Sequence, residues 1–123
     1  MNIALWIVQV ALAAMFAMAG VTKLTKPRAD LFDQLPWAED FSDTTVKTIG
    51  AAELTAAIGL ILPALTGIAP VLTPLAATGL AIIMILAAIT HARRREPVAI
   101  GFNVILLAAA AFVAWGRFGP HSL

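Results

Sequence analysis

The sequence contains no cysteine among its 123 residues, and only 12% of the residues are charged. Without thiols, the chain can have no disulfide framework, no redox-active cysteine pair, no thiol nucleophile and no cysteine-ligated metal. The formal net charge is only +1, and no basic run carries interleaved aromatic residues, so nucleic acid is not expected as a partner. Any redox chemistry would therefore need a bound cofactor or a partner protein.

Apolar residues are abundant instead, at 61% of the chain, and the mean hydropathy is +0.93. A typical globular protein is about half apolar and about a quarter charged. A soluble domain of this length buries only about two-thirds of its unfolded surface, which could not hide so many apolar side chains from water. The composition therefore predicts an integral membrane protein that contacts the lipid bilayer.

Four apolar stretches of 18 to 20 residues lie at 3–21, 46–65, 71–90 and 98–115. At a rise of about 1.5 Å per residue, each spans about 27 to 30 Å, the thickness of the hydrocarbon core. Because the joins at 66–70 and 91–97 are short, successive helices should run antiparallel. We predict an all-α membrane protein, a single domain in which four transmembrane helices form an antiparallel bundle with one long amphipathic first loop.

The first apolar stretch has a second interpretation. Ala17-Met18-Ala19 followed by Gly20 is typical of a signal-peptidase site after a hydrophobic run. No lysine or arginine precedes that run, and a signal peptide normally begins with a positively charged segment. The sequence therefore favours a membrane span over a signal peptide.

Lysine and arginine are distributed unequally between the two ends of the predicted bundle. Seven lie in or beside the first and third loops, namely Lys23, Lys26, Arg28, Lys47, Arg93, Arg94 and Arg95. The opposite end carries only Arg117. Since cationic loops stay in the cytoplasm, we expect a multi-pass protein of the cell membrane with loops 1 and 3 cytoplasmic and both termini outside.

Four polar residues lie near the cytoplasmic end of the spans, one on each helix: Lys23, Glu53, His91 and Asn103. Helical periodicity places each on a stripe of small residues, which marks the side of a membrane helix that faces other helices. A charge inside hydrocarbon costs at least about 2.5 kcal/mol, so such residues need partners and suggest function. We predict that these four form a ligand-binding cluster, without the spacing of a metal site. The sequence identifies no catalytic residue.

Each of the four residues also has a structural interpretation. Glu53 fits a carboxylate paired with Lys23 or His91 as well as it fits a proton or ligand site. Lys23 fits a cation at a helix end whose long side chain reaches toward water, and His91 fits a solvated histidine beside the membrane. Asn103, like Gln9, fits a hydrogen bond between helices. The sequence leaves these alternatives open.

The motifs around two of these residues resemble those of a known family. Residues 18–24, MAGVTKL, are similar to an AGxxKL signature, and residues 50–63, GAAELTAAIGLILP, are similar to a G-x-x-E-L-x-x-A-x-G-L-x-L-P helix. A helix that ends in HARRRE at 91–96, and a fourth helix that carries Asn103, complete the pattern. The chain resembles DoxX-like membrane proteins over nearly its whole length, which implies a four-helix integral membrane protein.

The resemblance also implies a role beside redox chemistry. DoxX-like proteins are implicated in quinone-linked sulfur oxidation and in membrane complexes that defend against oxidative and thiol stress. This implies a non-catalytic membrane subunit that supports a redox-protein partner and holds a quinone-like molecule. Two alternatives stay open: a membrane chaperone or scaffold without a small ligand, and a stand-alone enzyme or transporter for a small hydrophobic molecule. A homo-oligomer is compatible with the many small residues, but the sequence sets no stoichiometry.

Overall fold

The computed structural model describes the backbone of all 123 residues and every side chain except that of Arg28. The chain is helical, with four long helices and two short ones in the first loop. The elements are α1 (Asn2–Thr25), α2 (Arg28–Gln34), the 3-10 helix η1 (Pro36–Asp40), α3 (Asp43–Thr66), α4 (Leu72–Arg93) and α5 (Pro97–Phe118). The four long helices are each long and apolar enough to cross a membrane. The predicted all-α membrane fold is confirmed.

Each long helix extends beyond the apolar stretch that predicted it. α1 continues to Thr25 instead of ending at residue 21, and α3 begins at Asp43 instead of residue 46. The bounds differ because backbone hydrogen bonds continue through polar residues, whereas hydropathy marks only the part suited to hydrocarbon. Ser42 caps α3 by accepting a hydrogen bond from the Thr45 N–H. Lys23 therefore lies within the last turn of α1.

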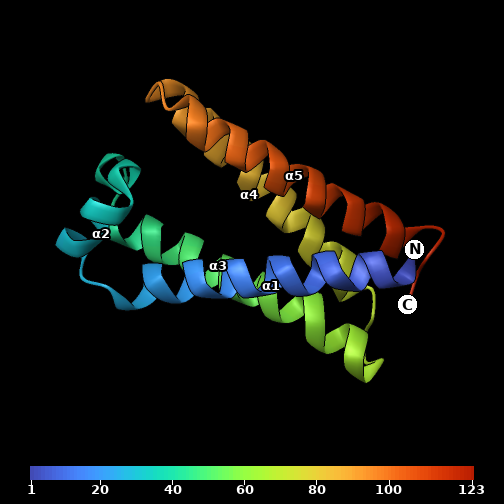
Figure 1. The fold of residues 1–123 in the computed structure, drawn as a ribbon. Coiled ribbons are helices and arrows are strands. Elements are labelled where there is room, and N and C mark those ends of the chain that lie inside the picture. The colour runs from blue at the N-terminus through green and yellow to red at the C-terminus, as the bar shows by residue number, and fades with distance from the viewer.

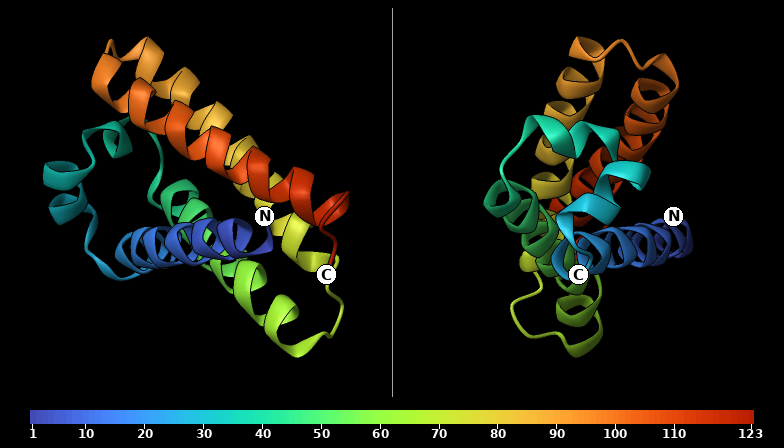
Figure 2. Two further views of the ribbon diagram at one scale, coloured as in Figure 1. Left: turned by 45° about the vertical axis from the view of Figure 1, so that its right-hand side comes forward. Right: turned by 90° about the vertical axis from the view of Figure 1, so that its left-hand side faces the viewer.

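The long helices form two antiparallel pairs, α1 with α3 and α4 with α5 (Figure 1). Helix α3 also packs against α4, and α1 against α5, so the four make a ring in which each helix has two neighbours. The two pairs meet at the end that holds both termini and the α3–α4 turn, and they diverge toward the other end (Figure 2). We call the first end the closed end and the second the mouth.

Apolar side chains fill the centre of the ring. The largest of them that are buried come from all four long helices: Leu12, Phe16, Leu60, Leu80, Met84 and Val113. Small residues lie among them, including Ala13, Ala57, Ala77 and Ala110. Large side chains on the outer surfaces, such as Ile3 and Ile105, are exposed in the isolated chain. In a bilayer these outer surfaces contact lipid.

A proline inside α3 shapes the contact between α3 and α4 near the closed end. Pro63 has no N–H, so the Gly59 carbonyl four residues earlier loses its helical partner. Thr73 Oγ1 on α4 donates a hydrogen bond to this carbonyl oxygen at 2.9 Å, and Thr73 is fully buried. The side chain of one helix thus satisfies the backbone of its neighbour.

The first loop lies at the mouth, between the diverging helix pairs (Figures 1 and 2). Its own apolar cluster centres on Leu31, Ala38 and Val46, with four partly buried residues around them: Phe32, Leu35, Trp37 and Phe41. Since Val46 belongs to α3, this cluster fixes the loop on the α1/α3 pair. Asp40 at the end of η1 reaches across to Arg94 after α4, with 2.8 Å between Oδ2 and Nη1. The first loop therefore connects both helix pairs at the mouth.

Candidate functional site

The α1/α3 pair carries a buried ion pair. Lys23 Nζ donates a hydrogen bond to Glu53 Oε1 at 2.5 Å, and the two side chains are only 8% and 3% exposed. The Trp37 ring of η1 adds a cation–π contact, with its centroid 5.6 Å from Lys23 Nζ. Each buried charge thus has an opposite charge beside it, which is the condition for keeping both in a low-dielectric interior.

Two glycines allow the helices to approach at this ion pair. A Cβ atom on Gly20 would lie 2.6 Å from the Gly50 carbonyl oxygen, and one on Gly50 would lie 2.7 Å from the Lys23 Cβ. Both distances are far below van der Waals contact, so only glycine fits either position. The close backbone approach brings Lys23 within direct reach of Glu53.

On the α4/α5 pair, charged and polar groups gather at the turn between the helices. His91 Nδ1 lies 2.8 Å from Glu96 Oε1, and Arg94 Nε lies 3.3 Å from the same oxygen. The hydrogen bond with His91 holds the pKa of Glu96 below its ordinary value of 4.5, and the charge of Arg94 acts in the same direction. The hydrogen bond with Asp40 raises the pKa of Arg94. Glu96 and Arg94 therefore stay charged at neutral pH.

A pocket of about 520 Å³ opens beside this turn. Apolar side chains predominate in its lining, which consists of His91, Glu96, Pro97, Val98, Ala99, Phe102 and Asn103. Asn103 is 8% exposed, and its Nδ2 is buried without a hydrogen-bond partner among the described atoms. A buried amide donor left unpaired costs about 1–3 kcal/mol. An acceptor supplied from outside the chain would remove this cost.

The structure divides the four predicted site residues into two groups. Lys23 and Glu53 bond to each other on one helix pair, whereas His91 and Asn103 line the pocket on the other. Among the side chains that the structure describes, no hydrogen bond or ion pair joins the two groups. The cause is the divergence of the helix pairs toward the mouth (Figure 2), which the phase of a single helix does not reveal. That these residues bind a ligand stays a prediction.

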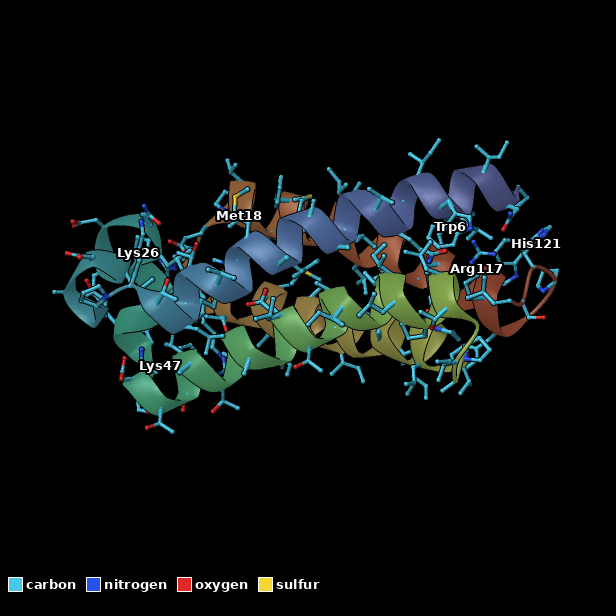
Figure 3. The ribbon with its side chains drawn as sticks, turned by 90° about the horizontal axis from the view of Figure 1, so that it is seen from below. Trp6, Met18, Lys26, Lys47, Arg117 and His121 are labelled. Atoms are coloured by element: carbon cyan, nitrogen blue, oxygen red, sulfur yellow. The ribbon has the colours of Figure 1, made fainter. Side chains whose placement is uncertain are left out.

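A third polar group lies at the closed end, where Gln9 forms the hydrogen bond between helices that its sequence position predicts, but the burial of Arg117 beside it was not predicted. Gln9 Nε2 donates to the Leu60 carbonyl at 2.8 Å, and Arg117 Nε donates to Gln9 Oε1 at 2.7 Å. Arg117 is only 3% exposed, and its Cζ lies 5.7 Å from the centroid of the Trp6 ring. Figure 3 shows Trp6 and Arg117 together at this end. Helical spacing could have revealed the group, since Arg117 follows the inward-facing Ala110 by seven residues.

A protein-family model described as the DoxX-like family matches residues 7–113 and so reaches into all four long helices. The protein belongs to the DoxX-like family. No curated protein and no solved structure matches the chain. Family membership, together with the four apolar helices, makes this DoxX-like chain a multi-pass membrane protein.

The DoxX-like motifs have a clear structural counterpart in this chain. Gly20 and Lys23 of the first motif contact Gly50 and Glu53 of the second. Pro63, at the end of the second motif, is the residue that frees a carbonyl for α4. The residues of these two motifs therefore build the contacts of α3 with its two neighbours, whereas residues that complete the family pattern, among them His91 and Asn103, line the pocket on the other helix pair.

Proposed function

We propose that this DoxX-like protein is a non-catalytic membrane subunit that supports a redox-protein partner and holds a quinone-like molecule in the pocket beside Asn103. The observation that carries the proposal is the buried, unpartnered Nδ2 of Asn103 in a mostly apolar pocket. A quinone combines a carbonyl acceptor with an apolar ring and tail. Its carbonyl would accept from Nδ2 while its ring packs against Phe102 and Pro97.

The neighbouring dyad of His91 and Glu96 supports the same assignment. Glu96 accepts from His91 Nδ1, which leaves Nε2 as the ring nitrogen that can form a hydrogen bond with a ligand. Reduction of a quinone to a quinol takes up two electrons and two protons, and in this proposal the partner protein carries out that step while His91 only forms a hydrogen bond with the bound molecule. In this proposal the electrons come from the partner protein, because the chain has no cysteine with which to carry them.

The distribution of cations supports an orientation with loops 1 and 3 in the cytoplasm and both termini outside. The pocket beside Asn103 then lies in the cytoplasmic half of the membrane. Because the chain has no native cysteine, accessibility is simple to measure with Asp33→Cys and Ser122→Cys in whole cells. We expect an impermeant thiol reagent to label only the Ser122→Cys variant, and labelling of Asp33→Cys alone would invert the orientation.

The pocket assignment is tested by the quinone content of the purified protein. We would purify the wild type and Asn103→Leu from native membranes in mild detergent and quantify extracted quinones per chain. The variant should hold several-fold less, since one hydrogen bond contributes about 0.5–1.5 kcal/mol. The control is Val104→Leu, an exposed neighbour on the same helix, which should match the wild type. Equal quinone content in Asn103→Leu and the wild type would refute the assignment.

A further inference from the structure

Arg117 has hydrogen-bond donors that no described group satisfies. Its Nε donates to Gln9 Oε1 at 2.7 Å, and its Nη1 donates to Asn2 Oδ1 at 2.7 Å and to the His121 carbonyl at 2.9 Å. A guanidinium has five N–H donors, so the two on Nη2 are left over. Nη2 is buried and has no partner.

Arg117 also lacks a compensating charge. Its acceptors are two side-chain amides and one backbone carbonyl, all neutral. In the described part of the chain, no carboxylate oxygen lies within 4.0 Å of a guanidinium nitrogen of Arg117, the distance of an ion pair. Every aspartate and glutamate lies between residues 30 and 96, so α1 and α5 contain none. A buried cation with neutral partners alone favours an anion as its ligand, because charge-assisted hydrogen bonds are the strong ones.

An apolar groove on the outer surface of α1 lies beside Trp6, whose ring contacts this guanidinium. It has a volume of about 470 Å³ and is lined by Ile3, Trp6, Ile7, Val10 and Ala11. Trp6 belongs to both features, since it lines the groove and its ring faces Arg117. Ile3 and Ile7 are mostly exposed, so this surface faces lipid in the membrane. The pairing of a cation with an apolar groove matches an anionic head group joined to a hydrocarbon chain.

We infer that Arg117 binds the phosphate of a membrane phospholipid whose acyl chain lies in the groove on α1. Arg117 lies in the last turn of α5, between the exposed aromatic residues Trp115 and Phe118. Aromatic residues of this kind mark the depth of the lipid head groups. The His121 carbonyl, in the turn after α5, accepts from Nη1, and in this proposal a shift of that turn exposes Nη2 to the phosphate. This site is independent of the pocket beside Asn103.

The inference is tested by thermal unfolding of the full chain in mild detergent, with three additives compared. Phosphatidylglycerol supplies both phosphate and acyl chains, diacylglycerol supplies the same chains without phosphate, and inorganic phosphate supplies the anion alone. We expect phosphatidylglycerol to raise the Tm with a saturable dependence on concentration, and the other two to leave it unchanged. An equal rise with diacylglycerol would show that only the chains bind, and a rise with inorganic phosphate alone would show a site for free anions. Either result overturns the inference.

Two variants distinguish lipid binding at Arg117 from a general effect of positive charge. Arg117→Gln should weaken the response to phosphatidylglycerol by about tenfold or more in concentration. Arg93→Gln removes an exposed arginine at the mouth and should respond as the wild type does. An unchanged response in Arg117→Gln would overturn the inference. If that variant does not fold, Val10→Trp, which fills the groove, should also weaken the response, and a wild-type response in Val10→Trp would contradict the inference.

Discussion

Glu53 accepts its hydrogen bond from Lys23 beside Gly20 and Gly50, where the backbones of α1 and α3 approach too closely for a Cβ atom on either glycine. The ion pair and the glycines depend on each other. Without the glycines the helices would lie too far apart for a direct bond, and without the bond the close contact would bury two uncompensated charges. The four residues therefore act as one structural unit that fixes α1 on α3.

Removing one partner of the ion pair should lower the free energy of unfolding much more than removing both partners. Glu53→Leu leaves Lys23 buried without a counter-charge, which should lower the free energy of unfolding by about 3–5 kcal/mol. The double variant Lys23→Met with Glu53→Leu should recover most of this loss. Unfolding in mixed detergent micelles, analysed as a double-mutant cycle, measures the coupling, and additive losses would show that the pair is not coupled.

Glu53→Gln distinguishes a structural carboxylate from a proton or ligand site. The amide keeps an oxygen that can accept from Lys23, so the fold should be disturbed less than by Glu53→Leu. For a purely structural role, stability and quinone content should change together in the two variants. A Glu53→Gln protein that is as stable as the wild type but holds no quinone would place Glu53 in the binding site instead.

The close contact at Gly20 and Gly50 predicts that replacing a glycine by alanine changes stability differently at different positions. Gly20→Ala places a methyl group 2.6 Å from the Gly50 carbonyl oxygen, so α1 and α3 must separate, at a cost of about 1–3 kcal/mol. Gly101→Ala on α5 is the matched control, because its added methyl meets no atom within 4 Å. It should be neutral, or stabilising by about 0.5–1 kcal/mol. Equal effects of the two substitutions on unfolding in detergent would contradict this packing.

The loss of stability caused by Thr73→Val should depend on the presence of Pro63. The substitution removes the only donor that the described structure gives to the Gly59 carbonyl, at a cost of about 1–3 kcal/mol. In a Pro63→Ala background the restored N–H can bond to that carbonyl, so Thr73→Val should cost less. Thr78→Val is the control, since Thr78 bonds only within its own helix. The same loss with and without Pro63 would refute the account.

Acid should loosen the turn between α4 and α5. The pKa of Glu96 is lower in the folded protein than its ordinary value of 4.5, so the folded state binds fewer protons there than the unfolded state. This contribution to stability is present above that value and is lost as the pH falls through the folded pKa. The protection of the turn's amides from hydrogen exchange, taken relative to the intrinsic exchange rate at each pH, should therefore fall as the pH is lowered below about 4.5.

Two variants identify Glu96 as the source of this acid response. Glu96→Gln should remove it, because the amide does not titrate in this range. Asp33→Asn alters an exposed carboxylate in α2 and should leave the response unchanged. If Glu96→Gln showed the same loss of protection in acid, another group would be responsible.

The number and positions of the spans could be predicted because four apolar stretches of membrane length dominate the sequence. The inward stripes could be predicted as well, and Gly50, Glu53, Ala57 and Leu60 are all buried on α3. The helix ends could not be predicted in this way, because the last turns, such as that at Thr25, and the first loop contain polar residues, which hydropathy does not assign to a membrane helix. Local periodicity was therefore sufficient to predict which face of each helix points inward.

The grouping of the polar residues depends on how the helices are arranged relative to each other. Periodicity places Lys23 and Asn103 on inward faces near the same end, but the divergence of the helix pairs is a property of the whole bundle. Arg117 was interpreted only as a charge of the outer face, because counting cations for topology ignores where each side chain points. Its burial follows from the seven-residue spacing to Ala110 and from Gln9 as an acceptor.

The proposed role of this protein as a non-catalytic subunit beside a redox partner is tested by what copurifies with it. The tagged chain would be isolated from native membranes in mild detergent, and its protein and quinone contents would be measured together. We predict a stoichiometric oxidoreductase and a bound quinone-like molecule, the latter diminished in Asn103→Leu. A chain that purifies alone and turns over a substrate at about 1 per second or faster would contradict the account.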